Sequence, residues 1–274
     1  MTKKTPYLGK KGISDFLLHK SHIHSWTTCK RCGLYSLMEI EGDPSGQLIT
    51  SAGTSFHDEC YNFFDRVDID VAKEKSEFEN NLIYYFRKNL VMKPETEELL
   101  KRFSLFQKDR FYAFQNNTKK WFPSNREIKI KRPDLGLAGT IDSIEYIYDD
   151  DSEDKAVVEY KSGRMSNWRK SKLRRELAVY KLLVDGTDIV SKPIEHIGAF
   201  CAGNERYEDG IMFEKVNKRT ITALFDVIKD IRKTLERAYI KEGTYDLDFF
   251  PIKSSNFCMM CQYSKMCYGD ELNE

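Results

Sequence analysis

The chain has 274 residues, enough to bury the core of one large domain or of two small ones. Its 44 Lys and Arg residues balance its 43 Asp and Glu residues, so overall charge does not indicate nucleic acid or a membrane surface, and any electrostatic signal must be local. No apolar run approaches the roughly 20 residues of a membrane span, and the opening residues MTKKTPYLGKKG lack the apolar core of a signal peptide. We therefore expect a soluble, cytoplasmic protein with no membrane partner.

The first half of the chain is predicted to be helical. Residues 51–67 begin with Ser and Thr, which favour helix starts, and continue with aromatic residues at helical spacing. Residues 79–90 and 94–117 keep that spacing, and the second of these stretches starts with a proline and several glutamates, as helix N-termini prefer. We interpret 68–122 as a helical insertion between the first helix and a sheet.

Strand patterns follow this helical region. β-branched and alternating sequences predict five strands, at 126–132, 137–150, 155–162, 194–203 and 210–216. The acidic run DDDSED suits an exposed hairpin tip, while 167–185 and 219–243 have helical spacing, the last of them ending at Gly243 as helices often do. The expected fold is a single α/β domain over 1–274, with a mixed β-sheet flanked by helices.

The third predicted strand, VVEYK, carries an acid and a base on one face. Glu159 and Lys161 are two residues apart, and side chains alternate along a strand, so both point to the same side. The preceding hairpin brings Asp142 close to Glu159. Two converging carboxylates are unfavourable unless a cation lies between them, and a hard divalent cation prefers such oxygen ligands. The alternative is an ion pair between Glu159 and Lys161 on a solvated strand.

A basic run follows this strand in a chain that is otherwise neutral. It leads into Glu176 and Tyr180, which are four residues apart and therefore share a helix face. Many basic runs are only solvated helix faces, but this one adjoins the expected metal, so we interpret it as a path for a DNA phosphate backbone. Its members are Arg164, Arg169, Lys170, Lys172, Arg174 and Arg175.

Four short motifs, in their order along the chain, resemble the PD-(D/E)XK nuclease superfamily and specifically its RecB-like branch. They are Gly53-x-x-x-His57, Gly139-x-x-Asp142, Glu159-x-Lys161 and Glu176-x-x-x-Tyr180. The resemblance implies a restriction-endonuclease-like sheet and Mn²⁺ or Mg²⁺ bound by His57, Asp142, Glu159 and the carbonyl of Tyr160. It also implies a catalytic role for Lys161 and an assisting role for Tyr180, whereas Glu176 stands where the branch normally has Gln.

Pro133-Asp134 supplies a competing acid for the metal. In the RecB-like branch the aspartate follows a glycine by three residues, as Asp142 follows Gly139. We therefore assign the metal to Asp142 and expect Asp134 to be a turn residue between strands.

Seven cysteines without an export signal indicate metal or cluster ligation in preference to disulfides. Part of the RecB-like branch, including CRISPR-associated RecB-type exonucleases and AddB-type helicase-nucleases, carries an iron-sulfur cluster, and the cysteine pattern resembles theirs. The resemblance implies a [4Fe-4S] clasp that joins the N- and C-terminal regions through Cys29, Cys258, Cys261 and Cys267. The alternative is zinc, held by Cys29 and Cys32 with Cys258 and Cys261. Cys60 and Cys201 are expected to be small buried hydrophobes.

Together these features imply a metal-dependent deoxyribonuclease. We expect an exonuclease that acts on single-stranded DNA or DNA ends, in DNA repair, recombination or CRISPR adaptation. The sequence has no G-x(4)-G-K-S/T phosphate loop, so a helicase, like a CRISPR adaptation protein, would be a separate partner. Two alternatives stay open: a non-cleaving DNA-end-binding subunit of a helicase-nuclease complex, and a site-specific endonuclease. The oligomeric state is open as well.

Overall fold

The computed structural model describes residues 16–42, 50–73, 81–114, 117–147, 153–241, 243–254, 258 and 261–268. Two compact units make up the chain. Unit 1 comprises Met1–Ile49, Ile130–Gly139 and Asn217–Glu274, and unit 2 comprises Thr50–Lys129 and Thr140–Val216. Within the described ranges, no helix has the length and apolar character needed to cross a membrane. The assignment of 1–274 to a single domain stays a prediction.

A mixed, five-stranded sheet has the order β1-β2-β3-β4-β5, and all of it except the end of β1 and the start of β2 belongs to unit 2. β2 and β3 are antiparallel, β3 and β4 are parallel, and β4 and β5 are antiparallel. The mixed sheet flanked by helices confirms the predicted fold class, and all five predicted strands form. Their bounds are β1 (Asn125–Arg132), β2 (Leu137–Tyr146), β3 (Lys155–Lys161), β4 (His196–Cys201) and β5 (Ile211–Lys215).

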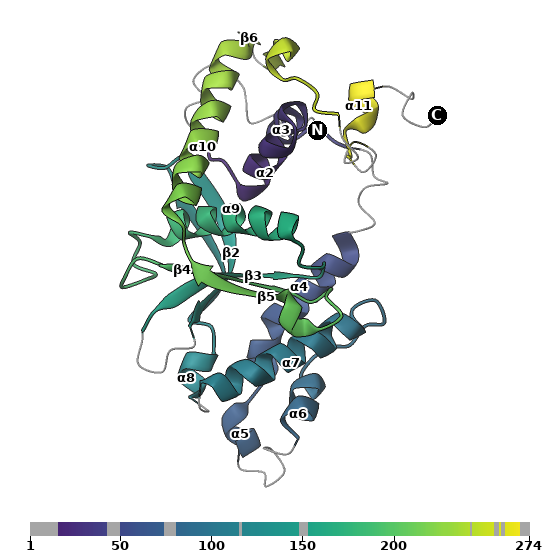
Figure 1. The fold of residues 1–274 in the computed structure, drawn as a ribbon, viewed down its shortest axis with the longest axis vertical. Coiled ribbons are helices and arrows are strands. Elements are labelled where there is room, and N and C mark those ends of the chain that lie inside the picture. The colour runs from purple at the N-terminus through teal and green to yellow at the C-terminus, as the bar shows by residue number, and fades with distance from the viewer. Residues whose placement is uncertain are drawn as a thin grey trace, which may run out of the picture. The chain divides into compact units, whose positions relative to one another are not determined.

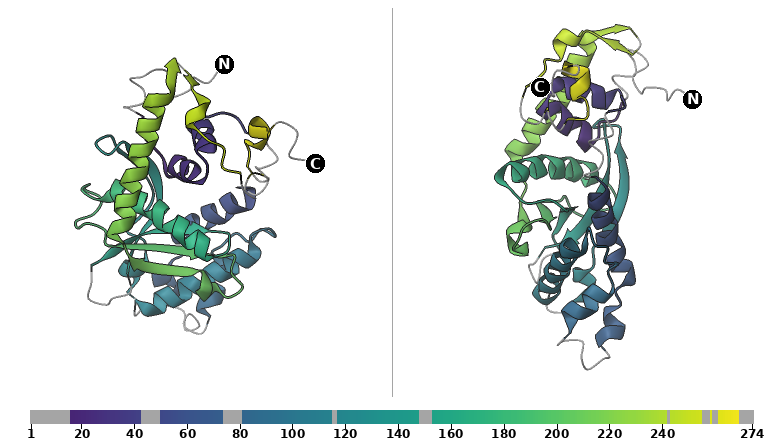
Figure 2. Two further views of the ribbon diagram at one scale, coloured as in Figure 1. Left: turned by 45° about the horizontal axis from the view of Figure 1, so that its top comes forward. Right: turned by 90° about the vertical axis from the view of Figure 1, so that its right-hand side faces the viewer.

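Helices cover both faces of this sheet (Figure 1). α9 (Asn167–Val184) connects β3 to β4 and packs on one face, whereas α4 (Thr50–Arg66) and α7 (Glu97–Ala113) lie on the other, as Figure 2 also shows. The predicted helical stretch after α4 is present and consists of several helices. They are α5 (Ile69–Lys73), α6 (Leu82–Lys88), α7 and α8 (Thr118–Trp121), and a 3-10 turn, η2 (Tyr207–Gly210), precedes β5.

An aromatic core holds α4 and α7 against the sheet. Phe103 packs edge-on against Phe63 of α4 and against Tyr160 of β3, and Phe106 stacks on Phe200 of β4 with ring centroids 4.4 Å apart. Alternation along β3 sends Ala156, Val158 and Tyr160 into this core and leaves Glu159 and Lys161 for the opposite face. Cys60 and Cys201 are fully buried, as predicted for small hydrophobes.

The β2–β3 hairpin sets the register on which the site depends. Ser143 pairs with Val158, and Tyr146 pairs with Lys155. Much of the acidic hairpin tip predicted between these strands lies outside the described residues. At the other end of the ladder, Asp142 and Glu159 each lie one residue beyond the last pair, which makes them neighbours.

Unit 1 contains α2 (Lys20–Thr28), α3 (Lys30–Leu37), α10 (Lys218–Ala238), the hairpin β6 (Tyr239–Lys241) and β7 (Thr244–Tyr245), η3 (Leu247–Phe249) and α11 (Ser264–Tyr268). The prediction that the last long helix ends at Gly243 is wrong. α10 ends at Ala238, and Tyr239 pairs with Tyr245 across the hairpin. Gly243 has φ +69° in the turn of that hairpin, so its left-handed backbone serves a strand connection and not a helix terminus.

Candidate metal centre

Asp142 is the point at which three elements of unit 2 meet. Asp142 is 8 % exposed, and neighbouring Glu159 is 1 % exposed. The backbone N–H of Tyr160 donates to Asp142 Oδ2 at 3.3 Å, and the hydroxyl of Tyr180 on α9 donates to Asp142 Oδ1 at 3.4 Å. The predicted proximity of Asp142 and Glu159 is therefore present in the fold, and Tyr180 contacts the same aspartate.

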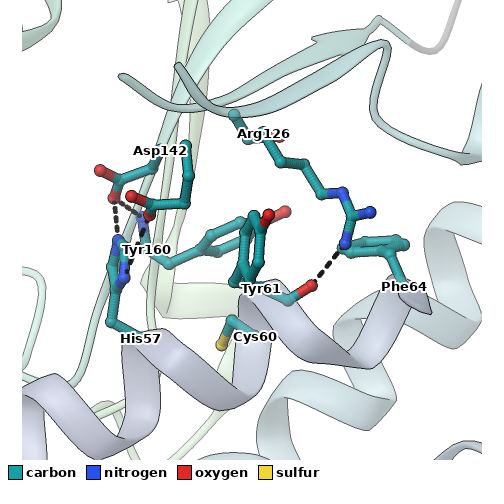
Figure 3. Close-up of a pocket in the computed structure, with 9 residues that line it drawn as sticks. His57, Cys60, Tyr61, Phe64, Arg126, Asp142 and Tyr160 are labelled. Atoms are coloured by element: carbon teal, nitrogen blue, oxygen red, sulfur yellow. Dashed lines mark hydrogen bonds and ion pairs between the residues drawn. The ribbon is translucent and has the colours of Figure 1, made fainter. Parts of the chain in front are cut away.

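His57 reaches the same aspartate from α4. Its Nε2 lies 2.8 Å from Asp142 Oδ2, and the two side chains point toward one another (Figure 3). The hydrogen bond with Asp142 raises the pKa of His57 against the opposing effect of burial, and the charges of Asp142, Glu127 and Glu159 add to the increase. The glycine-to-histidine motif thus lies on the predicted helix, with its imidazole directed at the predicted acid.

Glu127 on β1 is a member of the site that sequence analysis missed. Its Oε1 lies 3.4 Å from His57 Nδ1, so the imidazole lies between two carboxylates. Burial raises the pKa of Glu127, and the carboxylates of Asp142 and Glu159 also raise it, while His57 opposes them. The residue has φ +48°, an uncommon left-handed conformation for a glutamate in a strand. The sequence signal was weak, because Glu127 belongs to no motif and was only the one acid in the basic strand REIKIKR.

The donor set suits a divalent cation. One ligand atom from each of His57, Glu127 and Asp142 lies within 4.8 Å of the others, and the described part of the chain contains no second group of this kind. The two carboxylates suit Mg²⁺ or Mn²⁺, and the imidazole favours Mn²⁺ relative to Mg²⁺. Glu127 Oε1 is buried, and apart from its ion pair with His57 it accepts no hydrogen bond from the described residues, so a cation would add the interaction that a buried acceptor needs. The site therefore fits the metal that the motifs imply, with Glu127 added to the expected residues.

Lys161 lies beside this group and pairs with Glu159. Its Nζ donates to Glu159 Oε1, which is the same-face contact expected from their spacing on β3. Burial by itself would lower the pKa of Lys161, but the charges of Glu159, Glu176 and Asp142 raise it above its usual range. The ion pair of the alternative interpretation is therefore present, but its strand is not solvated, because Glu159 is 1 % exposed and the Lys161 side chain is 34 % exposed. The roles of Glu159 and the Tyr160 carbonyl as metal ligands stay predictions.

Glu176 and Tyr180 follow one another along α9. Glu176 is buried, and its Oε1 lies 3.6 Å from Lys172 Nζ one turn earlier in the helix. Burial, together with the charges of Glu159 and Asp142, raises the pKa of Tyr180 well above its usual range. Tyr180 is therefore a neutral hydrogen-bond donor to Asp142 and not a phenolate.

Asp134 has the surroundings expected of a turn residue. It lies in the turn between β1 and β2, and its carboxylate is paired with Arg132 at 2.7 Å. The hydrogen bond from Arg132 lowers the pKa of Asp134. The carboxylate of Asp134 is thus paired with Arg132 within the turn, as expected of a turn residue that does not bind the metal.

The predicted cluster cysteines lie in unit 1, in two segments that are far apart in the sequence. Arg31 donates hydrogen bonds to the carbonyls of Phe250 and Leu247, both at 2.9 Å. Tyr35 packs edge-on against Tyr263 with ring centroids 5.5 Å apart. These contacts hold the 29–32 segment next to the 247–268 segment.

The thiols of these segments interact with one another. A hydrogen bond between Cys32 and Cys261 raises the pKa of Cys32 and lowers that of Cys261 to about 6. Burial, followed by the nearby thiols of Cys29, Cys261 and Cys258, raises the pKa of Cys267. Cys32 was left out of the expected cluster, yet it contacts one of its members. Among the described residues, no three cysteine sulfurs lie within 4.8 Å of one another, so the iron-sulfur clasp stays a prediction.

The mixed sheet flanked by helices thus carries carboxylates, an imidazole and a lysine at the end of two paired strands, and three of these side chains form a group that could hold a metal ion. The model of the PD-(D/E)XK nuclease superfamily matches residues 21–268, and the chain belongs to this superfamily. This match confirms the superfamily expected from the motifs. No curated protein matches the chain.

Proposed function

We propose that the protein is a metal-dependent deoxyribonuclease whose active site is the group around Asp142. The observation that carries the proposal is the meeting of His57, Glu127 and Asp142 within ligand distance, in a member of a nuclease superfamily. One or two Mg²⁺ or Mn²⁺ ions bound there would activate water and stabilise the charge that develops on the phosphate. Hydrolysis of a phosphodiester needs both an activated water and stabilisation of the negative charge at the phosphate that is attacked.

The residues around the metal have distinct tasks in this proposal. His57, Glu127, Asp142 and Glu159 hold the cation, and the hydroxyl of Tyr180 fixes the orientation of Asp142 through its hydrogen bond. The ammonium of Lys161, positioned by Glu159, is placed to contact a phosphate oxygen and to stabilise negative charge in the transition state. In this arrangement Lys161 acts through its charge and not as a base.

The basic residues of α9 support DNA as the substrate. Arg164, just before α9, is well exposed and lies 3.7 Å from the equally exposed Glu205, and Lys172 of α9 lies 3.6 Å from Glu176. Arg174 differs from the expectation of a free phosphate contact, because its guanidinium forms a two-point ion pair with Glu214 of β5. We propose cleavage of single strands or DNA ends in the exonuclease mode, with backbone contacts made by the remaining basic residues.

Incubation with end-labelled linear and circular single-stranded DNA in Mn²⁺ tests this function. An exonuclease degrades the linear strand and spares the circle, whereas an endonuclease cuts both. A non-cleaving end-binding subunit would retard the linear DNA without shortening it. The Lys161→Ala protein, prepared in parallel, controls for contaminating nucleases.

We also propose that the chain belongs to the RecB-like branch and that unit 1 holds a [4Fe-4S] cluster. The support is the gathering of half-buried thiols from two distant segments, which is what a thiolate cluster requires. The contact between Cys32 and Cys261 keeps zinc as the competitor, since zinc would use both Cys-x-x-Cys pairs. Protein purified without oxygen should be brown and contain about four irons and four acid-labile sulfides if the cluster is present. A colourless protein with one zinc would contradict it.

A further inference from the structure

One ridge of side chains on α9 leads from solvent to the candidate metal centre. Trp168, Lys172, Glu176 and Tyr180 are each four residues apart, so consecutive members are neighbours on the helix surface. Their burial increases along the ridge, from 48 % exposed at Trp168 to 8 % at Glu176 and 1 % at Tyr180. The inner end of the ridge is the hydroxyl that donates to Asp142.

The first two steps along the ridge are contacts between side chains. The Nζ of Lys172 lies 5.8 Å from the centroid of the Trp168 ring and 3.6 Å from Glu176 Oε1. Trp168 and Glu176 are eight residues apart, which corresponds to about 12 Å along a helix axis. The exposed indole is therefore separated from the metal centre by only a few side chains, and one of them is a cation.

The charge and chemistry at the outer end fit an unpaired nucleotide strand. Trp168 is an exposed aromatic ring at the start of a basic helix, with Lys172 next to it and the exposed Arg164 four residues before it. Base faces are covered in a duplex and accessible in a single strand, and aromatic side chains bind single strands by stacking on those faces. Basic neighbours would contact the adjoining phosphates.

We propose that Trp168 stacks on an unpaired base of single-stranded DNA and that Lys172 contacts the neighbouring phosphate, so that the strand follows α9 toward Asp142. This inference rests on the proposed nuclease function and adds the strand type that the site selects. In this proposal Trp168 binds the DNA strand, whereas Asp142 binds the metal and Lys161 stabilises charge in the transition state.

The tryptophan content makes Trp168 directly observable. The chain has three tryptophans, and Trp26 and Trp121 are 4 % and 0 % exposed. Emission that iodide quenches should therefore come mainly from Trp168. Addition of a short oligothymidylate in EDTA, where metal-dependent cleavage is off, should quench that emission, and Trp168→Phe should remove the signal while largely retaining binding.

Affinity measurements on labelled oligonucleotides complete the test. Trp168→Ala should weaken single-strand binding about tenfold, in line with the loss of one stacked base, and should change binding of a blunt duplex of equal length much less. Tyr84→Ala is the matched control, because Tyr84 is 68 % exposed on α6 of the same unit, and it should bind as the wild type does. Unchanged single-strand affinity of Trp168→Ala, or equal losses on single strand and duplex, would overturn the stacking proposal.

The two proposals fail in different ways. If the wild type cleaves DNA in Mn²⁺ while Trp168→Ala binds and cleaves like it, stacking is wrong and the nuclease function stands. If the wild type neither binds nor cleaves any DNA in Mn²⁺, the nuclease function is wrong and stacking has no basis.

Discussion

Replacement of Glu145 by Leu should destabilise unit 2 by about 3–5 kcal/mol, because it leaves a buried guanidinium without its counter-ion. Arg110 Nη2 lies 2.9 Å from Glu145 Oε2, and the two side chains are 1 % and 0 % exposed. The hydroxyl of Tyr160 donates to the other carboxylate oxygen of Glu145. The single substitution therefore leaves a charge and a hydroxyl buried without their acceptor.

The loss of stability can be measured as a decrease in the midpoint of thermal unfolding, followed by circular dichroism. At about 2–4 °C per kcal/mol for a domain of this size, the expected decrease is roughly 6–20 °C. The triple variant Arg110→Met, Glu145→Leu, Tyr160→Phe should recover most of the loss, because an apolar set of similar volume removes the unmatched groups.

A matched surface control is available on α7. Glu98 pairs with Lys101 at 2.8 Å, but its side chain is 68 % exposed, so Glu98→Leu should leave the midpoint unchanged. A midpoint of the Glu145→Leu protein within about 1 °C of the wild type would refute the reasoning, since even 1 kcal/mol exceeds that shift. It would mean that the Arg110 charge is neutralised in another way.

Three further predictions concern the sites. Lys161→Ala should abolish cleavage in Mn²⁺ and retain DNA binding in a gel-shift assay, because Lys161 is assigned to charge stabilisation, and cleavage at the wild-type rate would contradict that role. His57→Ala should reduce the cleavage rate most at limiting Mn²⁺, since an imidazole contributes to metal affinity, and an equal loss at every concentration would point to another role. Cys267→Ser should bleach anaerobically purified protein and lower its iron content while Cys32→Ser changes iron content little, and the opposite order would favour zinc.

The sheet and the positions of its site residues followed from local sequence patterns, whereas the roles of the site residues came from the resemblance to a family. Alternation in VVEYK correctly placed Glu159 and Lys161 on one face, and the hairpin correctly brought Asp142 beside them. His57 was assigned from the resemblance of Gly53-x-x-x-His57 to a family motif, and its role as a metal ligand stays a prediction. The placement of Glu159, Lys161 and Asp142 was predictable because it depends on the geometry of one strand and of two consecutive strands.

The missed features depend on contacts or backbone geometry that no local pattern encodes. Glu127 enters the site with φ +48°, and neither that conformation nor its approach to His57 is visible in a strand pattern. α10 ends at Ala238 because the following Tyr239 pairs with Tyr245, although helical spacing continues past this point. The contact of Cys32 with Cys261 joins positions separated by most of the chain. Cysteine spacing alone could not predict it, because the expected cluster omits Cys32 and the zinc alternative includes it.

Binding of Mn²⁺, measured by the paramagnetic resonance of the free ion and combined with DNA cleavage by the same preparations, tests the metal centre most directly. The wild type should bind about one or two Mn²⁺ ions per chain and cleave single-stranded DNA. Asp142→Ala should lose both, Glu127→Gln should bind Mn²⁺ more weakly, and Asp134→Ala should behave as the wild type in both measurements. An Asp142→Ala protein that binds Mn²⁺ and cleaves DNA like the wild type would contradict the assignment of this site.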